Sequence, residues 1–325
     1  VDENTYYAYV RSLVEYHSMP VLISEFGLPT SRGVTHINHL SGLNQGGNSE
    51  LQQGEALVRM LMDIHRSGCM GGIVFAWHDE WFKTSWNTMD FDDSAARPKW
   101  LNVQSSEENF GLVRFSAFPS IQIDGDDADW AGIKPLSDNA ALKAGWDESY
   151  LYLRLNVDDF EHQTYCVPID TIAGEGNASY QGATFTRPAD FLLVLDGRQN
   201  TRLLADPYYN PNYKLYGQEI YPKDLLADFA LNGSGKFIAV EQVISNLMHM
   251  PQTGQIVPVQ LWDTGKMRYG VSNPQRPAFD AMADFCAGKG FVEIRIPWML
   301  LNFADPSSGK ILANLHTEGP FSFEH

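Results

Sequence analysis

The sequence predicts an α/β region followed by an all-β region. We interpret residues 1–117 as the last two βα units of an incomplete (β/α)8 barrel, and residues 118–325 as an antiparallel β-sandwich. The first region is predicted by helical apolar spacing that alternates with short apolar runs. The second is predicted by many short apolar runs separated by turn residues, a pattern typical of sandwiches.

Composition excludes several classes of function. The chain has 325 residues, and at about 100–200 residues per domain this length fits two domains. The net charge of −17 argues against nucleic acid and against an anionic membrane surface as partners. No run approaches the roughly 20 apolar residues of a membrane span. Three scattered cysteines are too few for a disulfide framework or a Cys-based zinc site.

Helices and strands alternate in the first region. Apolar residues at helical spacing predict a helix over residues 6–17, and residues 21–23 predict a strand buried on both faces. Ser49 and Gln52 form a capping box that begins a second helix. Residues 71–77 predict the next buried strand. This order implies a parallel sheet with right-handed crossovers.

Two strands cannot close a barrel. The remaining strands are therefore expected upstream of Val1, and we interpret the chain as a piece of a longer protein. A connection of about twenty residues, 28–48, separates the first strand from the second helix. Connections this long without periodicity are usually functional.

Glu25 is the candidate catalytic residue. It follows the first apolar strand, and in a barrel the carboxyl ends of the strands carry the active site. A carboxylate there fits a glycosidase nucleophile. The alternative is a strand-end Glu held by backbone amides or by an arginine such as Arg32.

The amino-acid sequences of the two strands resemble those of retaining glycoside hydrolases of clan A, such as the family 2 and family 5 enzymes. Ile23-Ser24-Glu25-Phe26-Gly27 is similar to the penultimate barrel strand, and Ile73-Val74-Phe75-Ala76-Trp77 is similar to the last one. The resemblance implies that Glu25 is the nucleophile and that Trp77 forms the floor of a sugar site. The acid/base Glu of the clan lies on an earlier strand that this chain lacks. Because retention needs two carboxyl groups roughly 5–5.5 Å apart, this fragment is expected to be inactive alone.

The residues after the second strand are candidates for substrate binding. The opening of the barrel at the carboxyl ends of the strands would be lined by His78, Glu80 and Trp81. Glu80 is the best substitute within this chain for a second carboxylate. His78 and Asp79 are alternatively expected to orient Glu25. The ordinary interpretation of this stretch is a loop with hydrogen-bonding and packing roles.

Two histidines lie in the long connection. His36 and His39 are placed to hydrogen-bond a ligand. A metal site would need a third protein ligand, and none is evident, so no metal site is predicted here.

The second region is predicted from several apolar runs. A hairpin is expected from residues 142–146 and 150–157, and a second one around the turn 232–235. Buried or alternating strands are expected at 191–195 and 291–297. The stretches 159–190 and 206–224 are expected to form irregular loops.

This region resembles carbohydrate-binding module family 9 and its relatives. The resemblance spans residues 121–312 and rests on Ile123-Asp124-Gly125, on the stretch 146–153 and on Ile296-Pro297-Trp298. It implies a β-sandwich whose relatives bind sugars or haem or have no known ligand, and we interpret this one as the sugar-binding type. Trp130 and Trp298 are expected to pack in the core. Other aromatic residues in loop-like stretches would contact a ligand or staple the loops: Tyr208, Tyr209, Tyr213, Tyr216 and Trp262.

Four aspartates crowd one turn of this region: Asp124, Asp126, Asp127 and Asp129. One interpretation is a Ca²⁺ site, because hard cations prefer such oxygen clusters. The other is a solvated turn whose carboxylates cap backbone amides. The spacing does not match an EF-hand, and we favour the capping interpretation, with no cofactor.

The leading hypothesis is the C-terminal fragment of a retaining glycoside hydrolase that acts on an oligo- or polysaccharide and needs the missing barrel half. We expect it outside the cell or in the cell envelope. The alternative is a non-catalytic glycan-binding or scaffold part of a larger envelope protein, or an accessory to another enzyme such as a glycosyltransferase.

Overall fold

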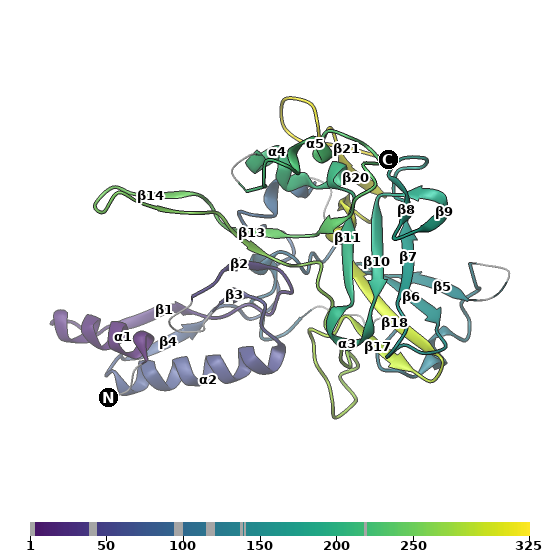
Figure 1. The fold of residues 1–325 in the computed structure, drawn as a ribbon. Coiled ribbons are helices and arrows are strands. Elements are labelled where there is room, and N and C mark those ends of the chain that lie inside the picture. The colour runs from purple at the N-terminus through teal and green to yellow at the C-terminus, as the bar shows by residue number, and fades with distance from the viewer. Residues whose placement is uncertain are drawn as a thin grey trace. The chain divides into compact units, whose positions relative to one another are not determined.

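The computed structural model describes residues 4–38, 44–93, 100–114, 121–136, 139, 141–217 and 220–325 (Figure 1). Contacts divide the chain into two compact units. Unit 1 is Val1–Trp86 with Val103–Ala117, and unit 2 is Asn87–Asn102 with Phe118–His325. Unit 2 thus includes residues 87–102, which the sequence assigns to the first domain. Strands predominate over helices in the described residues, and no described helix is long and apolar enough to span a bilayer.

Both helices predicted for unit 1 are present. Helix α1 (Thr5–Tyr16) begins after Asn4, whose side chain accepts a hydrogen bond from the Tyr6 amide at 3.0 Å. Helix α2 (Glu50–Arg66) begins with the predicted capping box. The Gln52 amide donates to Ser49 Oγ at 3.2 Å, and the Ser49 amide donates to Gln52 Oε1 at 2.8 Å. These reciprocal bonds satisfy amides that the first turn leaves unpaired.

The predicted parallel pair of strands is also present. Strand β1 (Leu22–Phe26) pairs with β4 (Gly71–Val74) in parallel. In the core of unit 1, Phe26 packs against three residues of α2: Leu57, Met60 and Ile64.

The expectation that both faces of these strands are buried is wrong. Leu22, Glu25 and Ile73 are exposed, because the helix-side cluster takes up only Ile23, Phe26 and Val74. The other face of the sheet has no such cover among the described residues. The closed barrel itself stays a prediction.

The long connection after β1 contains a small sheet of its own. Strand β2 (Val34–His36) pairs with β3 (Gln45–Gly46) in antiparallel fashion. The later segment 103–114, which includes the 3-10 helix η2 (Ser106–Glu108), lies beside both this loop and the end of β4. The Arg32 amide donates to the Val103 carbonyl at 2.8 Å, and the Leu112 amide donates to the Ala76 carbonyl at 3.1 Å.

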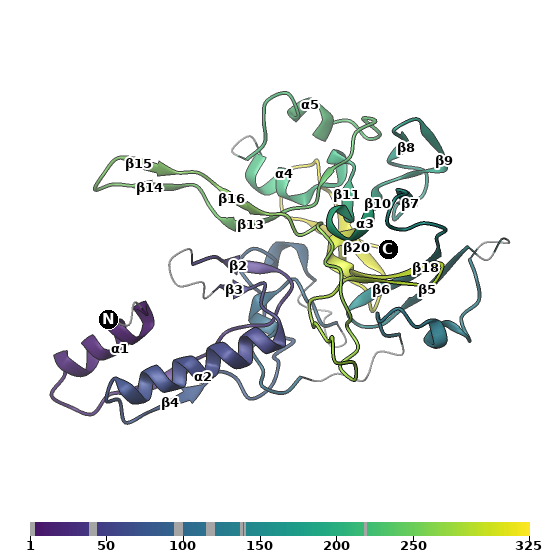
Figure 2. The ribbon, with the colours of Figure 1, turned by 60° about the horizontal axis from the view of Figure 1, so that its bottom comes forward.

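Unit 2 is built on two four-stranded antiparallel sheets, visible in Figures 1 and 2. The first has the order β12-β11-β10-β7 and the second β17-β18-β6-β5. Their bounds are β12 Ile238–Ala239, β11 Arg202–Ala205, β10 Phe191–Leu195, β7 Tyr165–Ile169, β17 Phe285–Gly288, β18 Phe291–Pro297, β6 Tyr150–Asn156 and β5 Leu142–Trp146. One apolar cluster joins them, with Leu193 and Leu203 from the first sheet and Leu153 and Ile294 from the second.

Several predicted strands of unit 2 are confirmed. The hairpin of β5 and β6 pairs Leu142 with Leu155 through Trp146 with Leu151. The run 191–195 is β10, with every residue buried. The run 291–297 is β18, a central strand between β17 and β6 that is buried on both faces.

Three predictions for unit 2 are wrong. Residues 206–224, which the sequence predicts to form an irregular loop, contain the 3-10 helix η4 (Pro207–Tyr209) and helix α4 (Pro211–Tyr216). Residues 159–190 contain β7, β8 (Asn177–Tyr180) and β9 (Ala183–Ala189), so the stretch is not irregular. The turn 232–235 does not join a hairpin, because β12 pairs with β11 and residues Leu226–Phe229 form helix α5. The amides of this turn bond elsewhere: Gly233 donates to Asp206 Oδ2 at 3.0 Å and Gly235 donates to Asn177 Oδ1.

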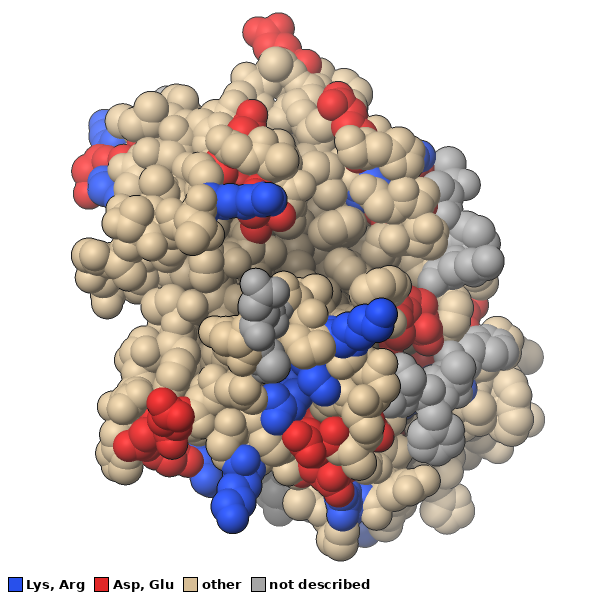
Figure 3. Space-filling view, turned by 90° about the vertical axis from the view of Figure 1, so that its right-hand side faces the viewer, with Lys and Arg blue, Asp and Glu red and all other residues tan. Residues whose placement is uncertain are grey.

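Unit 2 has further elements besides the two four-stranded sheets. They are the helices and 3-10 turns η1 Met89–Phe91, η3 Asp127–Trp130, α3 Gly197–Asn200, η4 Pro207–Tyr209, α4 Pro211–Tyr216 and η6 Trp298–Leu301, and the strands β13 Gln242–Ser245, β14 Met248–Met250, β15 Gln255–Val257, β16 Gln260–Trp262, β19 Phe303–Asp305, β20 Lys310–Ala313 and β21 Ser322–Glu324. On the face drawn in Figure 3, Lys and Arg side chains lie interspersed with Asp and Glu.

Candidate functional site

Glu25 lies at the carboxyl end of β1. It is the penultimate residue of the strand, whereas the sequence places it after the strand. Its side chain is exposed. The next residue, Phe26, accepts a hydrogen bond from the Phe75 amide at 2.9 Å, which continues the pairing of β1 with β4 beyond the last residue of β4. The pairing therefore brings the residues that follow β4 to the edge of the sheet that carries Glu25.

Trp77 follows β4 at this same edge. Its side chain is 73% exposed, which is unusual for an indole, because large aromatic residues are mostly buried. Since β1 and β4 are parallel neighbours, Glu25 and Trp77 both belong to the carboxyl-end edge of the sheet. This edge of the sheet therefore presents an exposed carboxylate and an exposed flat aromatic ring.

Asp79 anchors the segment after β4 to residues 110–113. Its Oδ1 accepts a hydrogen bond from the Gly111 amide at 2.9 Å. Burial raises the pKa of Asp79 to about 6, although the Gly111 hydrogen bond and Arg114 lower it. A Cβ at Gly111 would meet the Asp79 backbone nitrogen at 2.3 Å, so only glycine fits this approach. The contact of Asp79 is with this segment, and the expectation that Asp79 orients Glu25 stays a prediction.

His78 and Glu80 lie on either side of Asp79. His78 is exposed, and its Nδ1 is 2.9 Å from the Asp79 carbonyl. Glu80 forms an ion pair with Lys83 at 2.6 Å, and the Lys83 ammonium lies 4.3 Å from the centre of the Phe75 ring. The Glu80 carboxylate is thus engaged by Lys83.

Trp81 and His36 are the other predicted binding residues. Trp81 is half-buried, unlike Trp77. His36 is exposed on β2 opposite Gln45, whose side-chain amide donates to Glu107. His39 lies outside the described residues.

Sequence reasoning missed the acidic segment 106–108. Glu108 is fully buried, and its carbonyl accepts a hydrogen bond from the Glu80 amide at 3.0 Å. Glu107 accepts the hydrogen bond from Gln45. No periodicity in residues 87–116 signals that this segment returns to the end of β4, so the sequence offers no cue to it.

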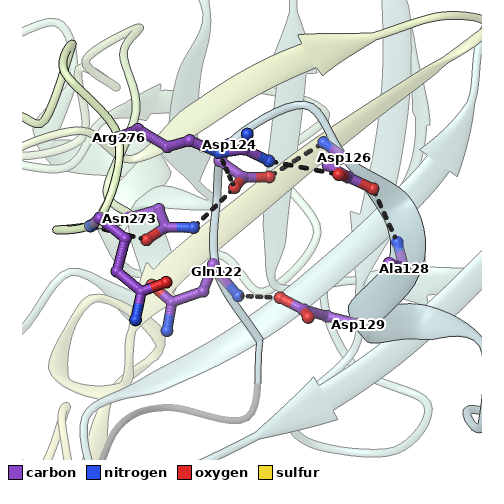
Figure 4. Close-up of a pocket in the computed structure, with 8 residues that line it drawn as sticks. Gln122, Asp124, Asp126, Ala128, Asp129, Asn273 and Arg276 are labelled. Atoms are coloured by element: carbon purple, nitrogen blue, oxygen red, sulfur yellow. Dashed lines mark hydrogen bonds and ion pairs between the residues drawn. The ribbon is translucent and has the colours of Figure 1, made fainter.

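A second candidate site lies in unit 2, at the turn with four aspartates (Figure 4). Asp124 Oδ2 accepts hydrogen bonds from Asn273 at 2.7 Å and from Arg276 at 3.0 Å. Asp126 Oδ1 accepts from the Ala128 amide at 3.2 Å, as the capping interpretation predicts. Burial raises the pKa of Asp124, but its hydrogen bonds lower it by more, so the net pKa is below the usual value.

The other two aspartates of the turn also have partners. Asp129 Oδ2 accepts from the Gln122 amide at 2.9 Å, and Asp127 forms an ion pair with Arg154 at 2.9 Å. The hollow lined by Asp124, Asp126 and Asp129 together with Asn273 and Arg276 has a volume of about 210 Å³, below the roughly 300–1,000 Å³ of ligand pockets. In the part of the chain that the structure describes, no three His, Cys, Asp or Glu side chains gather as metal ligands.

Glu293 of β18 holds this turn through hydrogen bonds from the turn's backbone amides. Glu293 Oε2 accepts hydrogen bonds from the amides of Asp124 at 3.1 Å and Gly125 at 2.7 Å, and Oε1 accepts from Trp130 Nε1 at 2.8 Å. Trp130 is fully buried, which confirms its predicted core role. The only cue to Glu293 in the sequence is a charged residue within the apolar alternation of residues 291–297.

Three of the aromatic residues predicted in loop-like stretches of unit 2 lie on η4 and α4 and contact other residues of this unit. Tyr208 stacks on His316 with ring centres 3.8 Å apart, and Tyr213 stacks on Phe229 at 4.6 Å. The Tyr209 hydroxyl donates to Glu175 Oε2 at 2.6 Å. Of the five aromatic residues named above, these three therefore have intramolecular partners. The expectation that the five lie in loops is wrong, since Tyr216 is the last residue of α4 and Trp262 the last residue of β16.

Comparison with known proteins gives no relative. No protein-family model, no curated protein and no solved structure matches this chain.

Proposed function

We propose that the chain is the C-terminal part of a retaining glycoside hydrolase that acts on an oligo- or polysaccharide outside the cell or in its envelope. Glu25 is its nucleophile and Trp77 carries the sugar ring. One observation supports this function above the others. Glu25 and Trp77, both exposed, belong to the carboxyl-end edge of two adjacent parallel strands.

The proposed reaction needs two carboxyl groups. Glu25 attacks the anomeric carbon as the glycosidic bond breaks, and a second carboxyl group protonates the leaving oxygen. That group then removes a proton from water, which attacks the glycosyl-enzyme and releases Glu25. Asp79 is engaged by Gly111 and Glu80 by Lys83. We therefore assign the acid/base role to a strand that this chain does not contain.

The uncovered face of the β1–β4 sheet supports the need for further strands. Leu22 is 48% and Ile73 56% exposed on this face. Parallel sheets are normally covered on both faces, and each Å² of apolar surface buried contributes roughly 25 cal/mol. Additional βα units would supply this cover and close the proposed barrel.

Unit 2 is proposed to be a β-sandwich of the sugar-binding type. Its two antiparallel sheets share one apolar core, which supports a sandwich. A binding module joined to a catalytic unit raises the effective concentration of a polymeric substrate. The competing function is a scaffold that binds glycans without cleaving them.

The test is the Glu25→Gln variant in the intact protein that carries the remaining strands. With a panel of nitrophenyl glycosides, kcat should fall by several orders of magnitude while substrate binding is retained, because the amide cannot act as nucleophile. The matched control is Glu55→Gln, at an exposed residue of α2 with no assigned role in the site, and it should keep kcat. A 2-deoxy-2-fluoro glycoside with a good leaving group should label Glu25, as detected by peptide mass spectrometry.

Two outcomes contradict the proposal. Unchanged turnover in Glu25→Gln would remove Glu25 from the chemistry. An intact protein that binds oligosaccharides but cleaves none, and takes no label, would support the scaffold instead.

A further inference from the structure

A long β-hairpin extends from unit 2. Residues 242–262, here called the arm, contain β13 and β16 at the base and β14 and β15 at the outer end. The base pairs Gln242 with Trp262, and the outer end pairs Met248 with Val257. In Figures 1 and 2, β14 and β15 project away from the two four-stranded sheets of unit 2.

The outer end of the arm is exposed on both faces. All three residues of β14 are exposed, and Met248 and Met250 retain 46% and 42% of their accessible surface. On β15, Ile256 is 57% exposed. A two-stranded hairpin without a third strand or a packed face is marginally stable in water. Apolar side chains and strand edges left open in this way mark an interaction surface.

The arm carries no charge. Residues 242–262 include no Asp, Glu, Lys or Arg, and this is the longest such stretch in the sequence. The rest of the chain has a net charge of −17, so two copies repel each other over most of their surfaces. At the arm this repulsion is absent. Natural strand edges usually carry charged residues that prevent pairing, and β14 has none.

We propose that the arm is a homodimer interface, in which β14 pairs edge to edge with β14 of a second copy. Antiparallel pairing about a two-fold axis at His249 places Met248 of one copy opposite Met250 of the other. Two hairpins then form one four-stranded sheet, which provides the additional strands that a lone hairpin lacks. This proposal is independent of the glycosidase activity.

The chemistry of the arm favours a second copy over an unrelated partner. A partner that placed a charge against the arm would desolvate it without an opposite charge to pair with. The covering surface must therefore be uncharged and must offer a strand edge. The arm itself meets both conditions, and a two-fold interface uses the same surface twice.

The first test is the molar mass of the chain in solution, measured by light scattering over a range of concentrations. The wild type should approach twice the monomer mass as concentration rises. The double variant Met248→Lys and Ile256→Lys should stay monomeric, because each arm then presents cations to its copy. The control is Leu136→Lys with Leu231→Lys, which adds the same charge at residues that are 65% and 56% exposed elsewhere in unit 2, and it should still dimerise.

Hydrogen exchange of the arm supplies the second test. Backbone amides of residues 246–257 should exchange more slowly as the dimer forms, and the double variant should lose this protection. A monomeric wild type at every concentration would overturn the proposal, and so would a dimer that survives in the double variant. A monomer with protected arm amides would also overturn it and would show that a different surface covers the arm.

Discussion

Glu293 is a buried carboxylate that organises the start of unit 2. Three hydrogen bonds from Asp124, Gly125 and Trp130 favour its ionised form, but burial has the larger effect and raises its pKa to about 7. The folded protein therefore prefers protonated Glu293 more than the unfolded chain does, whose pKa is near 4.5. The stability that this preference contributes is present in full below pH 4.5 and is lost as the pH rises through about 7.

This sign leads to a prediction for Glu293→Gln. As the pH rises from about 5 to about 8, ionisation of Glu293 should lower the free energy of unfolding of the wild type by roughly 1–3 kcal/mol. The variant cannot ionise at this residue, so its free energy of unfolding should fall less. Burial also raises the pKa values of Asp79 and Asp206 to about 6, so the difference between variant and wild type is the relevant quantity. Denaturant titrations across this pH range would measure it. Parallel pH profiles for the two proteins would contradict the assignment.

At the residue scale, the sequence predicts contacts between side chains that lie close together along the chain. The capping pair Ser49 and Gln52 is three residues apart and is found as predicted. The bond from Trp130 to Glu293 joins residues 163 positions apart, and no local pattern encodes it. Glu25 and Trp77 are predicted to share one edge from their strands alone, and the parallel pairing supplies that edge. Their catalytic and binding roles stay predictions.

Among the elements, β18 is a central, fully buried strand of unit 2. It pairs with β17 on one side and β6 on the other, and Ile294 at its centre is fully buried in the larger core. Removal of that side chain leaves a cavity between the sheets.

We expect Ile294→Ala to destabilise unit 2 by about 2–5 kcal/mol. Leu231→Ala, at an apolar residue that is 56% exposed, should change stability by about 0.5 kcal/mol or less. Equilibrium unfolding in urea would compare them. Equal losses would mean that β18 is not central to the core.

Elements with a clear local pattern are predictable, and elements with a distant partner are less so. Helices α1 and α2 and strands β10 and β18 follow their apolar periods. Strand β7 escapes prediction because its sequence, Tyr165-Cys166-Val167-Pro168-Ile169, contains a proline and sits in a polar stretch. Its strand conformation depends on pairing with β10, more than twenty residues later.

At the scale of the whole molecule, excess negative charge opposes folding. The sequence has 40 Asp and Glu residues against 23 Lys and Arg residues. Ion pairs such as Lys310 with Asp93, at 2.7 Å, offset part of the repulsion.

Salt should therefore stabilise this chain. Raising NaCl from about 0.05 M to about 0.5 M shortens the Debye length from roughly 14 Å to roughly 4 Å and screens the repulsion. We expect the melting temperature to rise by a few degrees, mostly below about 0.3 M, as differential scanning calorimetry would show. A melting temperature that falls with salt would mean that the ion pairs outweigh the net repulsion.

The division into units is only partly encoded in local sequence. Contacts assign residues 87–102 to unit 2 and residues 103–117 to unit 1, so the chain passes between the units more than once. Asn87 donates to the Val243 carbonyl at 2.7 Å, and Lys310 bonds Asp93 across 217 positions. Contacts at such separations come from the folded sheets and leave no periodic trace in residues 87–102.

The composition of the arm also decides which chemical probes can detect it. Trypsin has no cleavage site between Lys236 and Lys266, so the whole arm stays within one peptide, and lysine-directed cross-linkers have no target there. Met248 and Met250 are exposed thioethers, which mild oxidants convert to polar sulfoxides. Peroxide in storage would thus act on the arm much as the lysine substitutions do. Preparations of this chain that differ only in age would then differ in association state, and methionine sulfoxide reductase would restore it.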